Sequence, residues 1–166
     1  MAFVKRELTM QDVAVIVARS AESAASNEAY RAVEAIAADT VGWRLFTVLR
    51  YVETAQAVER VYSSNEKTYP VGGRKPLDKI TASHGAMEEG KVFLAATKGD
   101  VRKAFFDHEL IFSLGITAIL NVPIRHAGRR LGTMNFCGEE GMYGPAEIAR
   151  GKILAGLLVP WLLLAS

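Results

Sequence analysis

Residues 116–137, ITAILNVPIRHAGRRLGTMNFC, contain the pattern that decides the fold. The first part, residues 116–124, has almost no polar residues, which is typical of a central strand that is covered on both faces. Residues 126–129 have the composition of a hairpin loop, and residues 131–137 then form the partner strand. We therefore predict an antiparallel strand pair near the middle of a sheet.

A second strand pair is predicted upstream of the first. Residues 45–52 and 57–63 alternate with a period of two, and residues 53–56 supply the turn between them. In the later strand this alternation places Arg60 and Tyr62 on one face together with Val58. Residues 69–73, with one proline and two glycines, predict a loop that leaves the strand.

Helical spacing of apolar residues predicts the remaining elements. Residues 10–39 form an N-terminal helical segment capped by Thr9, and Ser26 lies where it can divide into two helices. Further helices are expected at residues 78–89, at residues 101–114, and from Pro145 to the C-terminus, with a brief strand at residues 92–96. This order predicts an α+β fold in which an antiparallel sheet is covered by helices.

Several short stretches of the chain, taken in their order, resemble a GAF domain. These stretches are WRLFTVLR (43–50), RVYSSN (60–65), YPVGG (69–73), FDH (106–108), LNVPI (120–124) and LGTMN (131–135). The resemblance covers residues 40–165. It implies a helical lead-in at residues 1–40 and a stand-alone GAF domain at residues 41–166. The implied fold is a GAF/PAS-like antiparallel sheet with helices on both faces, its terminal helices packed on one side.

Charge and cysteine content exclude several classes of protein. The chain has 166 residues, and its 20 Lys and Arg against 18 Asp and Glu give a net charge of +2, without the clustered positive charge that nucleic-acid binding requires. Cys137 is the single cysteine, so no internal disulfide or Cys-based zinc site is expected, and a reducing cytoplasmic location fits best. No targeting segment is expected at the N-terminus. The apolar run at residues 153–165 is short for a membrane span and is interrupted by Pro160, so we expect a buried or dimer-forming helix rather than an anchor.

The first group of candidate site residues lies on the predicted central hairpin. With ordinary register, Asn121, Thr133, Asn135 and Cys137 share one face of the sheet. Two amides on a nearly apolar strand pair are costly to bury unless they are hydrogen-bonded. Two interpretations follow: the amides contact a ligand, or they bond to each other and to the backbone and only stabilise the sheet.

Other candidates come from the predicted helix at residues 101–114, the second strand and the segment before residue 90. The resemblance places this helix as the roof of a ligand pocket; its candidates are Phe106, Asp107, Ile111 and Leu114. Asp107 could receive an amine or guanidinium, or form a structural ion pair. Arg60, with Tyr62, could hold a carboxylate or phosphate, or face solvent. His84 is a candidate ligand-binding or acid–base residue, but no histidine or carboxylate spacing typical of a metal site accompanies it.

The resemblance implies a small-molecule-binding sensor that holds its ligand between the sheet and the covering helices and signals through a homodimer of its N- and C-terminal helices. The ligand and any cofactor are not identified by the sequence. One alternative is a small metabolic enzyme that uses the same cavity, with Asp107 or His84 as the acid–base group. Free methionine sulfoxide reduction, known on this fold, uses separate attacking and resolving cysteines, whereas this chain has Cys137 alone. A third alternative is a dimerising or partner-binding module without a ligand.

Overall fold

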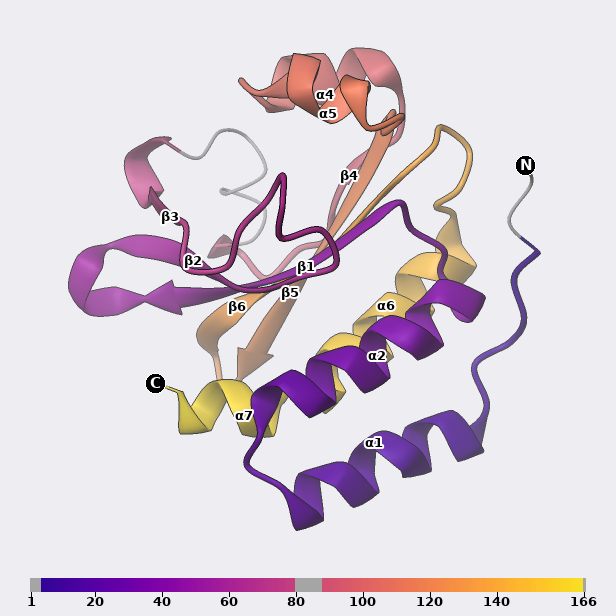
Figure 1. The fold of residues 1–166 in the computed structure, drawn as a ribbon, viewed down its shortest axis with the longest axis vertical. Helices are drawn as coiled ribbons and strands as arrows, with labels where there is room; N and C mark the ends of the chain where they lie inside the picture. The colour runs from indigo at the N-terminus through magenta and orange to yellow at the C-terminus, as the bar shows by residue number, and fades with distance from the viewer. Residues whose placement is uncertain (1–3, 80–87, 166) are drawn as a thin grey trace.

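The computed structural model describes residues 4–79 and 88–165, which are built around a six-stranded antiparallel sheet with the strand order β3-β2-β1-β6-β5-β4 (Figure 1). The strands are β1 (Leu45–Val52), β2 (Ala57–Ser63), β3 (Arg74–Pro76), β4 (Phe93–Ala95), β5 (Ala118–His126) and β6 (Arg129–Gly138). The α-helices are α1 (Met10–Glu22), α2 (Ser26–Thr40), α4 (Lys98–Ala104), α5 (His108–Ser113), α6 (Pro145–Leu157) and α7 (Val159–Leu164). Short 3-10 helices occupy Glu53–Ala55 and Leu77–Lys79.

The helices divide between the two faces of the sheet. Helices α2, α6 and α7 cover one face, with α1 packed on the outer side of α2 and α6, whereas α4 and α5 lie over the other face (Figure 1). The larger apolar core lies under the terminal helices and includes Phe46, Val48 and Phe136, all fully buried. A smaller core, which includes Leu45 and Ile119, lies under α4 and α5. The predicted α+β architecture, with the terminal helices packed on one side, is confirmed.

The central hairpin forms as predicted. Its turn consists of Ala127 and Gly128, which both have positive φ angles, as a two-residue turn between twisted strands requires. Asn121 lies opposite Asn135 in the β5–β6 register. The register shifts by one residue at Leu131, nearer the turn, and beyond this shift the two strands alternate regularly and place the amides on one face, as expected.

The N-terminal helical segment also follows the prediction. Thr9 and Asp12 form a reciprocal capping box at the start of α1. The segment divides into α1 and α2, because α1 ends with an extended residue at Ser23 and α2 begins at Ser26.

Two predicted helices are broken. The helix expected at residues 101–114 is two short helices, because Phe105 adopts an extended conformation after α4 and α5 begins only at His108. The capping box that starts α4 is formed by Thr97 and Asp100, one turn earlier than expected. The helix expected to run from Pro145 to the end of the chain divides into α6 and α7, with a proline in the first turn of α7. The helix expected at residues 78–89 falls largely outside the described residues.

The C-terminal apolar run is buried within this chain. Leu154, Leu158, Trp161 and Leu162 belong to the larger core. The expected buried helix is thus found for the side of the run that faces the sheet and α2, whereas Ile153 and Leu164 remain exposed, and the dimer stays a prediction. None of the described helices combines the length and the hydropathy that a membrane crossing requires.

A β-bulge in β2 corrects one sequence-based placement. Leu49 pairs with Arg60, whereas the preceding residue Val48 pairs with Tyr62, so Val61 is an extra residue in the ladder. The bulge reverses the alternation, and Arg60 and Tyr62 consequently face opposite sides of the sheet.

Candidate functional site

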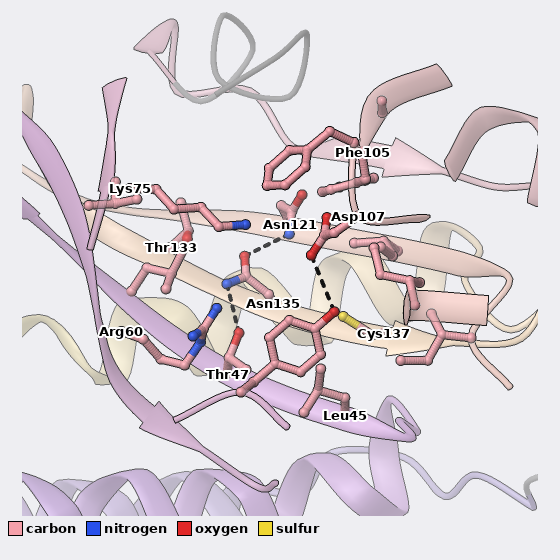
Figure 2. Close-up of a pocket in the computed structure, with 18 residues that line it drawn as sticks. Leu45, Thr47, Arg60, Lys75, Phe105, Asp107, Asn121, Thr133, Asn135 and Cys137 are labelled. Carbon is pink, nitrogen blue, oxygen red and sulfur yellow. Dashed lines mark hydrogen bonds between the residues drawn. The ribbon is translucent and has the colours of Figure 1, made fainter. Parts of the chain in front are cut away.

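A cavity of about 120 Å³ lies between the sheet and helices α4 and α5 (Figure 2). Its floor is formed by three neighbouring strands, β1, β6 and β5, and its sides by β2, β3 and the loop before β3. The lining is Leu45, Thr47, Leu49, Val58, Arg60, Tyr69, Lys75, Ala104, Phe105, Phe106, Asp107, Ile111, Ile116, Ile119, Asn121, Thr133, Asn135 and Cys137. The cavity is smaller than the roughly 300 Å³ at which drug-sized ligand sites begin, so it suits a small metabolite.

A row of polar side chains crosses the cavity floor. Asn121 Nδ2 donates to Asn135 Oδ1 at 2.7 Å, and Asn135 Nδ2 donates to Thr47 Oγ1 at 3.0 Å (Figure 2). The register makes this row possible because Thr47, Asn135 and Asn121 are direct cross-strand partners on β1, β6 and β5. We call these three residues the amide row. The two amides therefore bond to each other, which is one of the two interpretations that the sequence left open.

Asp107 lies above the floor at the junction of α4 and α5. It occupies the N-cap position of α5, yet its side chain makes no capping hydrogen bond. Its Oδ2 accepts a long hydrogen bond, 3.4 Å, from the hydroxyl of Tyr69. Burial and the nearby Asp107 carboxylate raise the pKa of Tyr69 well above its usual value, so the hydroxyl remains a donor.

Two cationic side chains reach the cavity from the other side. Arg60 stacks on the ring of Tyr69 with 5.0 Å between its guanidinium carbon and the ring centroid, and its Nη1 donates to the Pro70 carbonyl at 3.2 Å. Lys75 on β3 places its Nζ 5.1 Å from the ring centroid of Phe106. Figure 2 shows Arg60 and Lys75 on one side of the amide row and Asp107 on the other.

Three buried polar atoms of the lining have no hydrogen-bond partner within the described residues. They are Asp107 Oδ1, Arg60 Nε and Thr133 Oγ1, which we call the unpaired atoms. Buried polar groups are usually paired, because an unpaired group costs about 1–3 kcal/mol. The lining of this small cavity therefore contains one acceptor, one donor and one hydroxyl whose hydrogen-bonding capacity the described residues leave unused.

Cys137 closes one end of the cavity floor. It is buried, as expected, between its cross-strand partners Leu45 and Ile119. Burial raises the pKa of the Cys137 thiol to about 12, with Arg60 opposing the shift and Asp107 adding to it. The thiol therefore stays protonated at neutral pH, which disfavours it as a nucleophile.

The structure brings most of the predicted site residues together. Arg60, Phe106, Asp107, Ile111, Asn121, Thr133, Asn135 and Cys137 all line the cavity. Whether they bind a ligand stays a prediction. Phe106 is at the edge of the cavity rather than in its wall, since its side chain is 73% exposed.

The remaining predicted residues lie elsewhere. Tyr62 packs on the opposite face of the sheet against Phe46 and Tyr30 and donates to Glu34 of α2, so the prediction that it shares a face with Arg60 is wrong. Leu114 follows the last residue of α5 and packs into the smaller core without lining the cavity. Asp107 and Leu114 are the N-cap and C-cap residues of the short helix α5, and of these two only Asp107 lines the cavity. His84 lies outside the described residues.

Four polar or aromatic lining residues were not among the predicted ones: Thr47, Tyr69, Lys75 and Phe105. Thr47 could have been found from the pairing of β1 with β6. The other three depend on how the loop, the edge strand and the break between α4 and α5 return to the sheet, and the residue pattern carries no signal for this.

Metal binding finds no support in the part of the chain that the structure describes, where no three His, Cys, Asp or Glu side chains are grouped to hold an ion. The cavity chemistry is instead that of separate charged groups above an amide floor.

Comparison with known proteins identifies the fold. No protein-family model and no curated protein matches the chain. Among solved structures, the GAF domain of a phosphoenolpyruvate-protein phosphotransferase from Coxiella burnetii is similar, with 15% identity and a TM-score of 0.76 over 94% of this chain and 93% of that one. The GAF domain of a sensor histidine kinase from Bacillus halodurans gives 12% identity and a TM-score of 0.72 over 86% and 97%.

A third similar structure is the phycoerythrobilin-bound GAF domain of a cyanobacterial phytochrome, with 14% identity and a TM-score of 0.69 over 96% of this chain and 98% of that one. The chain therefore has the GAF fold, as its sequence resemblance implied. Identity at this level establishes the fold and leaves the ligand to be argued from the cavity.

Proposed function

We propose that this protein is a sensor domain that binds a small molecule in the cavity between the sheet and helices α4 and α5. The observation that carries the proposal is the set of three unpaired atoms, which belong to three residues that line the same cavity. A cavity with apolar walls and a few convergent polar groups is the usual form of a small-molecule site. The GAF fold, which the similar sensor histidine kinase domain shares, supports the same function.

The strands that line the cavity also contact the helices on the far face, and this supports a signalling role. On β1, Thr47 faces the cavity while Phe46 belongs to the core under the terminal helices. On β2, Arg60 faces the cavity while Tyr62 donates to Glu34 of α2. A ligand that moves either strand therefore changes the packing of the terminal helices, which is the physical requirement for coupling two sites.

We further propose that the protein acts as a homodimer through its N- and C-terminal helices. Helix α1 has an exposed apolar stripe at helical spacing, formed by Met10, Ala14, Val17, Ala18 and Ala21. On α6, Ile153 is also exposed. The stripe on α1 and the exposed Ile153, rather than the buried side of the C-terminal run, form the surface that a second copy covers. Sedimentation that shows a monomer at tens of micromolar would contradict this part of the proposal.

The binding function is tested by thermal unfolding with a panel of metabolites that includes cationic, anionic, neutral and zwitterionic compounds. A compound at about 100 times its dissociation constant adds about 2.7 kcal/mol, which corresponds to a rise of about 5–11 °C for a chain of this length. Hydrogen exchange with the same compound should slow at β1, β6 and α5, and should also change in α2.

Two variants locate the binding. Asn135→Leu alters the cavity floor and should weaken the response to the active compound. Met134→Leu is the matched control, because Met134 is the neighbouring residue on β6 and lies in the core on the other face. If no compound stabilises the protein, or if both variants respond as the parent does, the cavity is not the binding site.

A further inference from the structure

The cavity separates opposite charges without pairing them. The carboxylate of Asp107 stands on one side of the amide row, and the cations of Arg60 and Lys75 stand on the other (Figure 2). In the part of the chain that the structure describes, no ion pair joins Asp107 to either cation. Buried or half-buried charges are normally paired, since desolvating an unpaired charge is costly.

The carboxylate is held away from the partners that its position offers. An aspartate at a helix N-cap ordinarily accepts from a backbone N–H, which stabilises the helix by about 1 kcal/mol. Asp107 makes no such bond at the start of α5. Its Oδ2 has the long bond from Tyr69, and its Oδ1 is one of the unpaired atoms. The geometry therefore leaves one carboxylate oxygen of a cavity-lining residue without a donor.

The guanidinium of Arg60 also has an unpaired atom, which is a donor where that of Asp107 is an acceptor. Its Nη1 has one carbonyl partner, Pro70, and its Nε is unpaired within residues 4–79 and 88–165. Burial lowers the pKa of Arg60, while the Asp107 carboxylate acts to raise it. The charged guanidinium is therefore less stabilised than that of an arginine in solvent. A carboxylate that accepts hydrogen bonds from two of its nitrogens would replace the lost interactions with water.

The space between the two charged sides fits a short molecule. The cavity volume is about 120 Å³, and Leu45, Ile111 and Ile119 give it apolar walls. The amide row crosses the floor between the charges, and the unpaired hydroxyl of Thr133 lies beside it on β6. A ligand of a few carbon atoms can therefore contact both charged sides and the apolar walls together.

We propose that the ligand is a small aliphatic zwitterion, a molecule with one ammonium and one carboxylate group, which places its ammonium at Asp107 and Tyr69 and its carboxylate at Arg60 and Lys75. This inference rests on the proposed sensor function, because it names the chemical class of the ligand for the same cavity. A ligand with only an anionic group would leave Asp107 unpaired and repel it. A ligand with only a cationic group would leave Arg60 and Lys75 unpaired and would be repelled by them.

The test measures binding of matched compounds by calorimetry and thermal unfolding. The zwitterions are L-alanine, L-valine, L-leucine, β-alanine and 4-aminobutanoate, which vary both bulk and charge separation. Each is paired with the acid that lacks the ammonium and the amine that lacks the carboxylate; for L-valine these are 3-methylbutanoate and 2-methylpropylamine. At least one zwitterion should bind at millimolar concentration or below, and its two analogues should bind about tenfold more weakly or worse.

Two charge-removing variants assign the groups. Asp107→Asn and Arg60→Gln should each weaken binding of the active zwitterion by about ten- to hundredfold. Glu109→Gln and Arg74→Gln are the matched controls, since both residues are exposed neighbours that do not line the cavity, and they should leave the affinity unchanged. Asp107→Asn should not lower the melting temperature of the ligand-free protein, because it removes an unpaired buried charge; this separates loss of binding from loss of folding.

Three results would overturn the inference: an analogue with a single charge that binds as tightly as its zwitterion, an Asp107→Asn protein with full affinity, or no binding of any zwitterion. If the zwitterions fail but another compound of the metabolite panel binds in an Asn135-dependent way, only this inference falls and the sensor function stands. If no compound of any class binds, both fall.

Discussion

Replacing Asn135 by leucine is expected to destabilise the protein by about 1–3 kcal/mol, which is the cost of leaving a buried polar group unpaired. The change removes the acceptor of Asn121 Nδ2 and the donor to Thr47 Oγ1. The Thr47 hydroxyl can rotate to another acceptor, whereas the Asn121 amide is only 7% exposed and is fixed on β5. Most of the cost is therefore the lost partner of Asn121.

The assay is equilibrium unfolding in urea, supported by thermal melts. For a chain of this length, each kcal/mol corresponds to about 2–4 °C, so the melting temperature should fall by about 2–12 °C. Thr133→Val is the control on the same strand and face. Because Thr133 Oγ1 is one of the unpaired atoms, the valine should be neutral or stabilising in the ligand-free protein.

The double variant Asn121→Leu/Asn135→Leu makes the test decisive. Removing both partners leaves no unpaired amide, so its stability should lie above that of Asn135→Leu, with a coupling of about 0.5–3 kcal/mol. An Asn135→Leu protein as stable as the parent, or a double variant whose loss equals the sum of the single losses, would refute the reasoning about the amide row.

Gly132→Ala should destabilise by about 1–3 kcal/mol or more in urea unfolding, because a Cβ at this position would lie 2.0 Å from a backbone oxygen of β1. Gly99→Ala should change stability by less than about 1 kcal/mol, because its Cβ would make only an ordinary contact, 3.6 Å from Thr97 Oγ1, and equal losses in the two variants would contradict this. The hydrogen bonds from Arg6 lower the pKa of Asp12 below its ordinary value of about 3.9, so Asp12 contributes stability above that pH and loses it as the pH falls further. Asp12→Asn should therefore be less stable than the parent at pH 7 and equal to it at strongly acidic pH, and a pH-independent difference would count against the assignment. Cys137 should react with a disulfide reagent at pH 8 much more slowly in the folded protein than in urea, because burial raises its pKa to about 12; rapid labelling of the folded chain would show that the thiol is accessible.

The floor of the site was predictable because it depends on a local regularity. From the pair Ala118–Gly138 to the pair Ile124–Gly132, residues on β5 and β6 pair and alternate without interruption. A register shift at Leu131 separates this stretch from the two-residue turn, so Asn121 and Asn135 lie in the regular part of the ladder. Once Asn121 and Asn135 are placed opposite each other, their shared face follows. The fold class was predictable for the same reason, since the order of period-two and helical segments survives errors at their boundaries.

The roof and the sides were less predictable because they depend on contacts distant in sequence. Apolar residues recur at helical intervals on both sides of the break between α4 and α5, since both helices face the same sheet, and the spacing alone therefore does not reveal the break. Phe105 follows the last residue of α4, packs against Phe93 with 6.1 Å between the two ring centroids, and lines the cavity. Tyr69 and Lys75 reach the cavity from a loop and an edge strand whose course is set by tertiary packing.

The bulge in β2 has a consequence for changes of chain length. Val61 is the extra residue of the ladder, so a chain that lacks it pairs β1 with β2 without interruption, and Arg60 and Tyr62 become adjacent residues on opposite faces. A deletion inside a strand ordinarily inverts one half of that strand, but here it keeps both side chains on their present sides. Relatives of this protein are therefore expected to differ by one residue within this strand, and an alignment that forbids gaps in strands will assign the wrong residue to the cavity in such relatives.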